Sequence, residues 1–373
     1  MADDSALRGF AARRALLAGG GSGGHVFPAL AVGEELARRG WIVALAGSPT
    51  GMEARLAAER GLPFVALPAR PLRGKSLWAK LLALVTLVRS AWSARRAIRD
   101  GNFDLVVGTG GYASAPAVLG GRFARRPTVL IEPNAEAGLA NRWASRFADA
   151  AAVAYEATAA RLKCLSWVTG VPVRAAFFDI APLRADGKPR LLVLGGSQGS
   201  LRINRLMPEV LAPLFDRMPE LSVLHQCGET HLEATLALYR AAGLETPRLR
   251  VVSFVDSVPA AMAAVDLVIS RAGAITLAEI CAAGRPSVLL PLLAAGAHQL
   301  ANAQLLADAD AASLIEDVAL DAERLGGELA TLLGDRARLA RMGENARRLA
   351  HPRAAAAIVD RIEALLPPLG RAA

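Results

Sequence analysis

Cysteine and long apolar runs are scarce in this sequence, and acidic residues are scarce in one segment of it. Cysteine occurs three times in 373 residues, and the wide spacing of Cys164, Cys227 and Cys281 matches neither a disulfide framework nor a metal-binding motif. Such scarcity is typical of a protein kept in a reducing cytosol. Residues 81–88 are too few to cross a bilayer, and residues 286–307 lack formal charge but contain prolines and polar side chains. The sequence therefore predicts no transmembrane helix and, with Asp3 and Asp4 at its start, no signal peptide.

The shortage of acidic residues is confined to one segment. The whole chain has a formal net charge of +9, and residues 70–100 contain eight basic residues and one acidic residue, Asp100, which gives this segment a net charge of +7. A local basic surface binds an anionic partner, either phospholipid or nucleic acid. Because no recognised RNA- or DNA-binding motif accompanies the segment, we expect no nucleic acid as partner.

The basic segment also has the spacing of a helix. Leucine, valine and tryptophan recur at intervals of three and four over residues 76–99, which places them on one helix face. This face either packs against the core with the basic residues in solvent, or inserts into an anionic membrane with the basic residues among the headgroups. In the second alternative we expect Leu77, Trp78 and Leu81 to make the membrane contact.

A glycine-rich loop opens the first strand-to-helix unit. Residues 14–18 are typical of a buried strand, residues 19–25 (GGGSGGH) form the loop, and a helix is expected from Pro28 onward. Backbone N–H groups at such a helix start bind phosphate, and glycine lets the anion approach closely. Gly19, Gly21 and Gly24 also satisfy the G-x-G-x-x-G pattern of nicotinamide dinucleotide sites. The next strand, however, ends at Ala46 without an acidic residue to bind a ribose, which argues against that cofactor.

Strand and helix patterns alternate along the sequence and predict an α/β fold. A length of 373 residues allows two domains. Residues 179–189 have the composition of a linker, after which an apolar run at 190–194 and a second glycine loop at 195–199 repeat the arrangement of the first half. We therefore predict two Rossmann-like domains with parallel sheets that face each other across a cleft, with the ligand at the carboxyl ends of the strands.

Polar residues in the second half are spaced as in a nucleotide-sugar site. Residues 195–199 (GGSQG) match the nucleophile elbow of α/β-hydrolases, but short glycine loops are common, and we favour Ser197 as a phosphate- or sugar-binding residue. A strand at 267–270 leads through a turn to a helix that starts at Ala274, whose N-terminus can bind phosphate. Glu279 on that helix can accept the hydroxyls of a ribose. Gln299 and Asn302 share one helix face, and their amides suit sugar hydroxyls.

Taken together, these stretches resemble the MurG family. That family transfers N-acetylglucosamine from UDP-N-acetylglucosamine to lipid I (undecaprenyl-pyrophosphoryl-N-acetylmuramyl-pentapeptide), which gives lipid II for peptidoglycan synthesis. The resemblance extends over about residues 12–360 and depends on the order and spacing of motifs at residues 19–28, 108–112, 132–134, 170–174, 195–199, 271–279 and 299–302. It implies a GT-B fold and an inverting transfer. The sequence departs from the family at Ser22, where Thr is usual, and at residues 131–134, where IEPN replaces His-Glu-Gln-Asn.

The resemblance also implies the roles of the matching residues. Ser197 would contact the diphosphate, the backbone of Val255 the uracil, and Glu279 the ribose, while Arg174 and Arg271 would stabilise the leaving diphosphate. The implied donor-binding residues are Ser22, Gly23, Gly24, Asn134 and Arg174 in the first part of the chain and Ser197, Val255, Arg271, Ala274, Ile275, Thr276, Leu277, Ala278, Glu279, Gln299 and Asn302 in the second.

The implied reaction is a direct displacement at the anomeric carbon. The 4-hydroxyl of N-acetylmuramyl attacks, UDP leaves and the configuration inverts. We expect His25 to be the base, because a helix N-terminus favours a neutral ring; the alternative role for His25 is a hydrogen bond to an acceptor phosphate, and Glu132 is the second candidate base. No cofactor or metal is required, stimulation by Mg²⁺ stays open, and Asp308 and Asp310 are interpreted as a solvated surface pair.

The expected domains are residues 1–174, which bind the acceptor and the membrane, and residues 175–352, which bind the UDP-sugar; a C-terminal helix at about residues 353–373 can pack back on the first domain. We expect a peripheral protein on the cytoplasmic face of the bacterial inner membrane. The alternatives are another GT-B transferase that uses a UDP-sugar and a lipid acceptor, a nicotinamide-dependent oxidoreductase, and a lipid-surface binding protein without catalysis.

Overall fold

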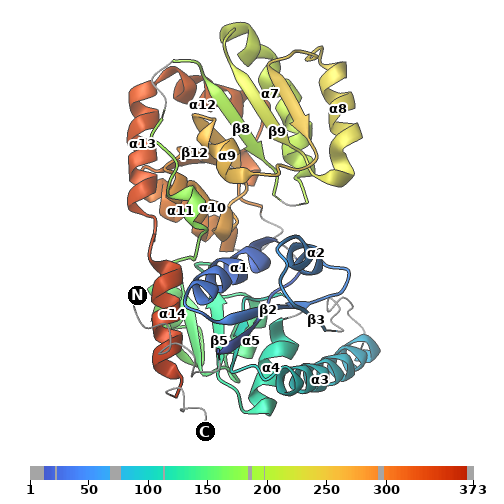
Figure 1. Ribbon diagram of the computed structural model, residues 1–373. Coiled ribbons are helices and arrows are strands. Elements are labelled where there is room, and N and C mark those ends of the chain that lie inside the picture. Colours follow the sequence, from blue (N-terminus) through green and yellow to red (C-terminus); the bar gives the residue numbers. More distant parts are fainter. Residues whose placement is uncertain are drawn as a thin grey trace, which may run out of the picture. The chain divides into compact units, whose positions relative to one another are not determined.

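The computed structural model describes residues 12–21, 23–67, 77–111, 114–183, 187–196, 198–292 and 298–367, with the side chains of the helix at 77–100 described from Val85 onward. The chain divides into two compact units. The first comprises the chain up to Pro133, Ala137–Pro172 and the segment from Arg353; the second comprises Asn134–Glu136 and Val173–Pro352. Figure 1 colours both units along the sequence.

The first unit is a parallel sheet with the strand order β3-β2-β1-β4-β5-β6-β7. Alternate residues of β1 enter opposite faces of this sheet: Leu17 packs in the cluster that includes α1 and α14, and Leu16 in the cluster that includes α3 and α4. Because helices cover both faces of the sheet, the central strands are almost entirely apolar. The elements are β1 (Arg14–Ala18), α1 (Gly23–Arg38), β2 (Ile42–Gly47), α2 (Met52–Glu59), β3 (Phe64–Ala66), α3 (Leu77–Asp100), β4 (Leu105–Gly108), α4 (Ser114–Ala124), β5 (Thr128–Glu132), α5 (Leu139–Ala144), β6 (Ala150–Val153), α6 (Glu156–Ala159), β7 (Leu165–Val168) and α14 (Ala354–Leu365).

The second unit is a parallel sheet with the order β10-β9-β8-β11-β12-β13. Its central strand is built in the same way, with Leu191 and Val193 packed on one face and Leu192 and Leu194 on the other. The elements are η1 (Ala175–Phe177), β8 (Arg190–Leu194), α7 (Leu201–Arg217), β9 (Ser222–Gln226), η2 (Glu229–His231), α8 (Leu232–Ala241), β10 (Leu249–Val252), α9 (Val258–Ala263), β11 (Leu267–Ser270), α10 (Ala274–Ala283), β12 (Ser287–Leu289), α11 (His298–Asp308), β13 (Ala312–Leu314), η4 (Asp317–Ala319), α12 (Ala322–Gly334) and α13 (Arg336–Arg348).

Aspartates fix the register at the amino ends of three strand pairs. Each precedes a strand by one residue and accepts the first backbone N–H of the neighbouring strand: Asp104 from Arg14 (2.9 Å), Asp149 from Thr128 (2.8 Å) and Asp266 from Arg190 (2.9 Å). Because a slip of one residue would exchange the two faces of a strand, these bonds help to hold the carboxyl ends of the strands, and the loops that follow them, in place.

The predicted fold class is confirmed: both units are Rossmann-like, and every strand pair in the described part of the chain is parallel. The strands expected at 190–194, 222–226 and 267–270 are present as β8, β9 and β11. Three short strands, β3, β7 and β13, were not predicted, because three or four residues hold too little of an alternating pattern to recognise. Within the described residues, no helix is long and apolar enough to cross a membrane.

Two local predictions differ from the structure. The first helix begins at Gly23 and not at Pro28, so that Pro28 lies inside α1 and His25 in its first turn. The segment predicted as a linker is anchored at its start, because Arg347 donates to the Ile180 carbonyl (2.6 Å) and the buried Arg285 to the Ala181 carbonyl (3.0 Å). Those two guanidinium groups fix this part of the chain to the second unit.

Candidate active site

In the first unit, the loops that follow β1 and β4 meet at the carboxyl edge of the sheet. The strand order reverses between these two strands, and ligands of open α/β sheets bind at such a point. Thr109 joins the loops: its N–H donates to the Ala18 carbonyl (2.9 Å) and its Oγ1 to the His25 carbonyl (2.6 Å). A Cβ at Gly19 would overlap Thr109 Oγ1, and a Cβ at Gly111 would overlap the Gly20 carbonyl. These glycines are required by contact between the two loops, without reference to any dinucleotide.

The same contact fixes the protonation pattern of His25. Its Nδ1 lies 2.9 Å from the Thr109 carbonyl oxygen. Because a carbonyl can only accept, Nδ1 carries the hydrogen, and in the neutral ring Nε2 is the nitrogen with the basic lone pair. The first turn of α1 disfavours a positive charge on the ring. His25 is therefore held in the tautomer that a general base needs.

Glu132, the second candidate base, lies at the end of β5 and is buried. Its Oε2 accepts from the Gly138 N–H (2.9 Å), at the start of α5, and from Asn141 Nδ2 (3.0 Å). Gly110 lies between this pair and the histidine, since a Cβ there would be 2.8 Å from His25 Nδ1 and 3.6 Å from Asn141 Nδ2. The structure thus brings both candidate bases to one loop, and it gives Glu132 bonds that anchor α5 to the strand.

In the second unit, the corresponding point lies between β8 and β11, and a guanidinium bridges it. Arg271 Nε and Nη2 donate to the Ser200 hydroxyl (3.0 and 2.7 Å), and Nη1 donates to the Leu290 carbonyl (2.9 Å). Ser200 is the N-cap of α7. Burial lowers the pKa of Arg271 from its ordinary value. The contacts of Arg271 therefore hold the loops after β8, β11 and β12 together, a role that the sequence did not suggest.

The start of α10 differs from the start of α7. Its N-cap is Gly273, which has no side chain to accept the first N–H groups of the helix, and a Cβ built there would meet no atom within 4 Å. Gly196, in the loop after β8, has the same open space at a φ of 85°. Uncapped N–H groups beside open space suit an anion, as expected for a diphosphate at this edge of the sheet.

Glu279 lies five residues into α10 from Ala274, 8% exposed, with Oε1 3.3 Å from Arg174 Nη2. Burial raises the pKa of Glu279 to about 7, and the guanidinium of Arg174 opposes the shift. The Arg174 side chain also lies over the Phe177 ring, 5.0 Å from its centroid. The structure thus brings two of the expected donor-binding residues together as an ion pair.

The expected sugar-binding amides hold backbone segments. Asn302 is buried, accepts from the Ala135 N–H (2.9 Å), and donates to Asn134 Oδ1 (3.3 Å) and the Ala272 carbonyl (3.2 Å). All of these residues belong to the second unit. Gln299 Oε1 accepts from the Leu292 N–H (2.9 Å). These contacts position the loop before α10 and the segment at Asn134.

The remaining expected site residues are placed as follows. Gly23 and Gly24 form the start of α1, with Gly24 exposed, and Val255 is half-buried in the loop between β10 and α9. Thr276 and Ala278 are half-buried, whereas Ala274, Ile275 and Leu277 are buried. Ser22 and Ser197 lie outside the described residues, as do the side chains of Leu77, Trp78 and Leu81.

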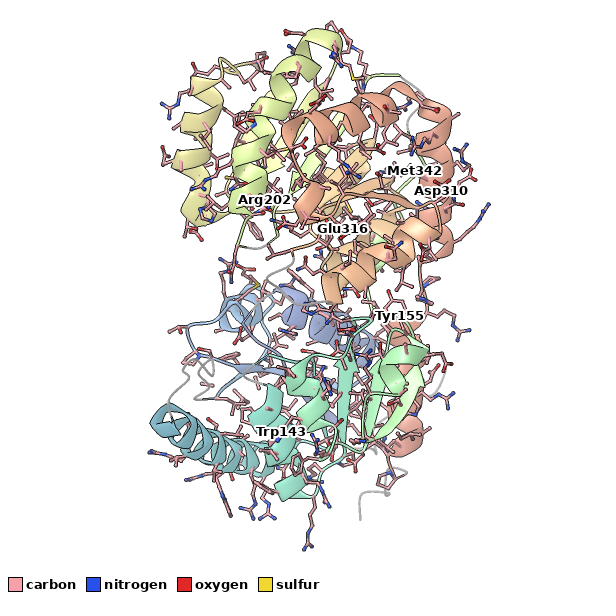
Figure 2. The ribbon with its side chains drawn as sticks, turned by 180° about the vertical axis from the view of Figure 1, so that it is seen from behind. Trp143, Tyr155, Arg202, Asp310, Glu316 and Met342 are labelled. Atoms are coloured by element: carbon pink, nitrogen blue, oxygen red, sulfur yellow. The ribbon has the colours of Figure 1, made fainter. Side chains whose placement is uncertain are left out.

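Asp308 and Asp310 have surface partners. Asp308 accepts from Gln304 (2.7 Å), and Asp310, labelled in Figure 2, pairs with Arg341 of α13 (3.4 Å) with both side chains more than half exposed. Within the described ranges, no cluster of three or more His, Cys, Asp or Glu side chains could hold a metal ion.

Similarity to known proteins extends over most of the chain. The N-terminal domain of glycosyltransferase family 28 matches residues 15–153, and the C-terminal domain of that family matches residues 190–358. A protein of Stutzerimonas stutzeri named UDP-N-acetylglucosamine–N-acetylmuramyl-(pentapeptide) pyrophosphoryl-undecaprenol N-acetylglucosamine transferase is 42% identical, over 94% of this chain and 98% of its own length. A Cellvibrio japonicus protein of the same name is 40% identical over 92% and 96%. The crystal structure of Acinetobacter baumannii MurG is 33% identical, covers 94% of this chain and 99% of its own, and superposes with a TM-score of 0.73.

This chain belongs to the MurG family. Membership confirms the resemblance inferred from the motifs, the GT-B fold and the glycosyltransferase class. It also accounts for the G-x-G-x-x-G match at Gly19, which belongs to a MurG-family loop and not to a nicotinamide site. Ile131, where the family usually has His, is buried in the core of the sheet, and its carbonyl accepts from Asn141 Nδ2 (3.0 Å).

The sequence did not predict that Thr109, Asn141, Ser200 and Gln226 hold the loops of the candidate site in place. Each binds a backbone group or another side chain in a loop at the carboxyl edge of its sheet. A usable signal was the run of glycines in these loops, because a loop without side chains must be held by groups from elsewhere.

Proposed function

We propose that this protein transfers N-acetylglucosamine from UDP-N-acetylglucosamine to the 4-hydroxyl of N-acetylmuramyl in an undecaprenyl-pyrophosphoryl-linked acceptor. The observation that carries the proposal is the similarity across nearly the whole chain, at 42% identity, to a transferase named for this reaction. The local geometry supports it, because the second unit has a helix start open to a diphosphate and, farther along the same helix, a buried carboxylate for a ribose.

The proposed chemistry divides between residues of the two units. The acceptor oxygen forms a bond to the anomeric carbon, and the bond from that carbon to the β-phosphate oxygen breaks, with its electron pair leaving on UDP. His25 Nε2 takes the hydroxyl proton, and the Nδ1–H bond to the Thr109 carbonyl fixes the tautomer of the neutral ring in which Nε2 has the basic lone pair. Arg174 and the N–H groups at the start of α10 balance the growing charge on the diphosphate. Arg271 acts on the diphosphate by positioning the loops that carry its ligands.

The direct test is release of UDP. Purified protein is incubated with UDP-N-acetylglucosamine and a lipid I analogue, with UDP-glucose as the alternative donor and NADH as the control for an oxidoreductase. We expect UDP release that depends on both substrates, with UDP-glucose at least tenfold slower. Oxidation of NADH, or no UDP release by folded protein, would refute the proposal.

We also propose that the protein binds an anionic membrane surface through α3 and α4. The sequence left two alternatives for the apolar face of α3. In its described part, the residues packed on the fold are Ala91, Ala94 and Ile98, whereas Val88 (46% exposed) and Trp92 (56% exposed) face outward. The described part of the predicted apolar helix face therefore does not pack against the core.

A mixed apolar and basic surface results, which we call the α3–α4 surface. It consists of Val85, Val88, Trp92 and Phe123 with the nearby Arg95. The Trp92 and Phe123 rings lie 6.2 Å apart, and the Arg95 guanidinium lies 5.0 Å from the Trp92 ring centroid. The two helices lie side by side in Figure 1. Aromatic rings beside guanidinium groups suit the interface of an anionic bilayer, and we propose that the protein binds the cytoplasmic face of the inner membrane.

Vesicle binding tests this surface. Trp92→Ser with Phe123→Ser should weaken binding to phosphatidylglycerol vesicles about 10- to 100-fold. Burial of a fully exposed aromatic side chain contributes about 1.5–3 kcal/mol, and each of these two side chains has about half of its surface left to bury (56% and 43% exposed). The control is Leu165→Ser, which removes a similarly exposed side chain (59%) from β7. Equal binding by both variants, or equal binding of wild type to phosphatidylcholine vesicles, would refute the proposed surface.

A further inference from the structure

One side chain joins the loop after β8 to the loop after β10. Gln226 is the last residue of β9, which lies between these two strands, and it is 4% exposed. Its Nε2 donates one hydrogen to the Gly196 carbonyl (3.0 Å) and the other to the Ser253 carbonyl (3.2 Å). A single amide therefore spans three adjacent strand ends.

Backbone N–H groups also bind the two carbonyls that Gln226 joins. The Gly196 carbonyl also accepts from the Gly199 N–H (2.9 Å), and the Ser253 carbonyl also accepts from the Gly228 N–H (3.1 Å). The first of these bonds lies within one loop, and the second ties the Ser253 loop to the segment after β9. Gly196, Gly199 and Gly228 all have positive φ angles, a conformation that glycine adopts freely but does not itself fix.

A buried network of hydrogen bonds holds the segment that carries Gln226. Asn204 Nδ2 donates to the Cys227 carbonyl (2.9 Å), so Asn204 Oδ1 is the acceptor that faces His225 Nε2 (3.1 Å). His225 Nε2 therefore carries the hydrogen, and Nδ1 accepts from the Tyr239 hydroxyl (2.7 Å). Burial lowers the pKa of His225 to about 4, which keeps the ring neutral. The backbone at Gln226 is thus fixed by groups outside the two loops, in addition to the bond that its carbonyl accepts from the Gly195 N–H (3.3 Å).

We propose that Gln226 is a positioning residue that sets the distance between the diphosphate and the base of the bound donor. This inference rests on the proposed function, in which the loop at 195–199 contacts the diphosphate and the loop of Val255 contacts the uracil. With Gln226 in place, both loops are held at one spacing before the nucleotide arrives. Without it, only backbone contacts with the end of β9 hold the two loops, among them the bonds from the Gly195 N–H to the Gln226 carbonyl (3.3 Å) and from the Gly228 N–H to the Ser253 carbonyl (3.1 Å). The spacing between the loops is then fixed less tightly, and the diphosphate contributes less to binding.

The test compares how much the diphosphate adds to nucleotide binding. Gln226→Met keeps the volume and removes the Nε2 donor of both bonds. Gln226→Glu keeps the size and replaces Nε2 by an oxygen that faces two carbonyls. The control is Arg248→Met, which removes hydrogen bonds to the Phe215, Met218 and Pro219 carbonyls beside the amino end of β10. Calorimetry measures the Kd of uridine and UDP, kinetics measures KM for donor and acceptor, and thermal unfolding measures Tm.

For Gln226→Met we expect UDP affinity to fall about tenfold and uridine affinity less than threefold, because binding must then fix the loop spacing that Gln226 fixes in the free wild-type protein. Donor KM should rise in parallel and acceptor KM stay within twofold. Gln226→Glu should lose more UDP affinity than Gln226→Met. Arg248→Met should lower Tm without changing the ratio of the two Kd values.

Three results would overturn the proposal. UDP affinity unchanged in both Gln226 variants would make the contact merely structural, and so would an equal loss of uridine and UDP affinity. A change of the same kind in Arg248→Met would assign the effect to general destabilisation. If wild-type protein binds no UDP, the proposed donor site itself fails, and that outcome is distinguishable because it precedes any substitution.

Discussion

Replacing His25 by asparagine separates the two things that this histidine does in the structure. The imidazole donates through Nδ1 to the Thr109 carbonyl (2.9 Å), and it presents Nε2 as the basic nitrogen. The Nδ2 amide group of asparagine occupies the place of Nδ1, so His25→Asn keeps the hydrogen bond but has no counterpart of Nε2. His25→Ala loses both.

The magnitudes follow from these two losses. Removing a general base lowers turnover about 10²- to 10⁴-fold. This corresponds to about 3–5 kcal/mol in the activation barrier. Leaving the Thr109 carbonyl without its partner costs about 0.5–1.5 kcal/mol of unfolding free energy. We therefore expect both variants to lose turnover to a similar extent, and only His25→Ala to lose stability.

The assay measures kcat and KM for both substrates together with denaturant unfolding. Turnover within tenfold of wild type in a folded His25→Asn protein would refute the role of base and leave a hydrogen bond to the acceptor phosphate as the function of His25. In that case Glu132→Gln should show the larger loss.

Four further predictions concern pH, backbone, ion pairing and metal. Burial raises the pKa of the Glu279 carboxyl from 4.5 to about 7, so between these pH values the carboxyl is protonated in the folded state and ionised in the unfolded state. As pH increases over this range, the free energy of unfolding should fall in denaturation experiments and UDP affinity should rise in calorimetry. A flat affinity profile in wild type would contradict this. Gly111→Ala should lower stability by about 1–3 kcal/mol more than Gly40→Ala, because both positions have positive φ but only the first would overlap a neighbouring loop; equal losses in chemical denaturation would count against the loop contact. Arg39→Met should lower stability by about 1–3 kcal/mol, because this side chain binds carboxylates of both α1 and α14. Arg38→Met, at an exposed pair, should leave stability unchanged in the same denaturation measurement. Similar losses in the two variants would reject the tie to α14. Dialysis against EDTA should leave UDP release within twofold, because guanidinium groups and N–H groups face the diphosphate in the proposed site; a tenfold loss restored by Mg²⁺ would overturn this expectation.

Much of the fold could be predicted from the sequence, because the central strands are short apolar runs that end in glycine loops. The same logic placed α10 and Glu279, since a helix start after a strand is a local feature of sequence. The start of α1 was misplaced because Pro28 is a strong signal for a first turn, whereas the actual start at Gly23 depends on Thr109, far along the chain, which binds the His25 carbonyl.

The roles of individual polar residues were harder to predict for a physical reason. Spacing along a helix indicates which side chains share a face, but not which backbone groups from distant segments need a partner. Asn302, which was expected to bind sugar, holds the Ala135 N–H and the Ala272 carbonyl, and its spacing along the helix does not indicate either contact. Gln226 gave no signal at all, since a glutamine at the end of a strand has no typical pattern until the two loops that it joins are known.

The first unit is built from segments near both ends of the chain, and this affects the order in which the two units fold during synthesis. Ile358, Val359 and Ile362 of α14 are buried in the same core cluster as Leu17 and Leu30, near the other end of the chain. A ribosome has therefore synthesised the whole second unit before the residues that complete the first unit leave it. The second unit can fold first, whereas the first unit has an exposed apolar face until α14 is synthesised. Chains that stop short of α14 should accordingly expose the core of the first unit while the later unit remains intact.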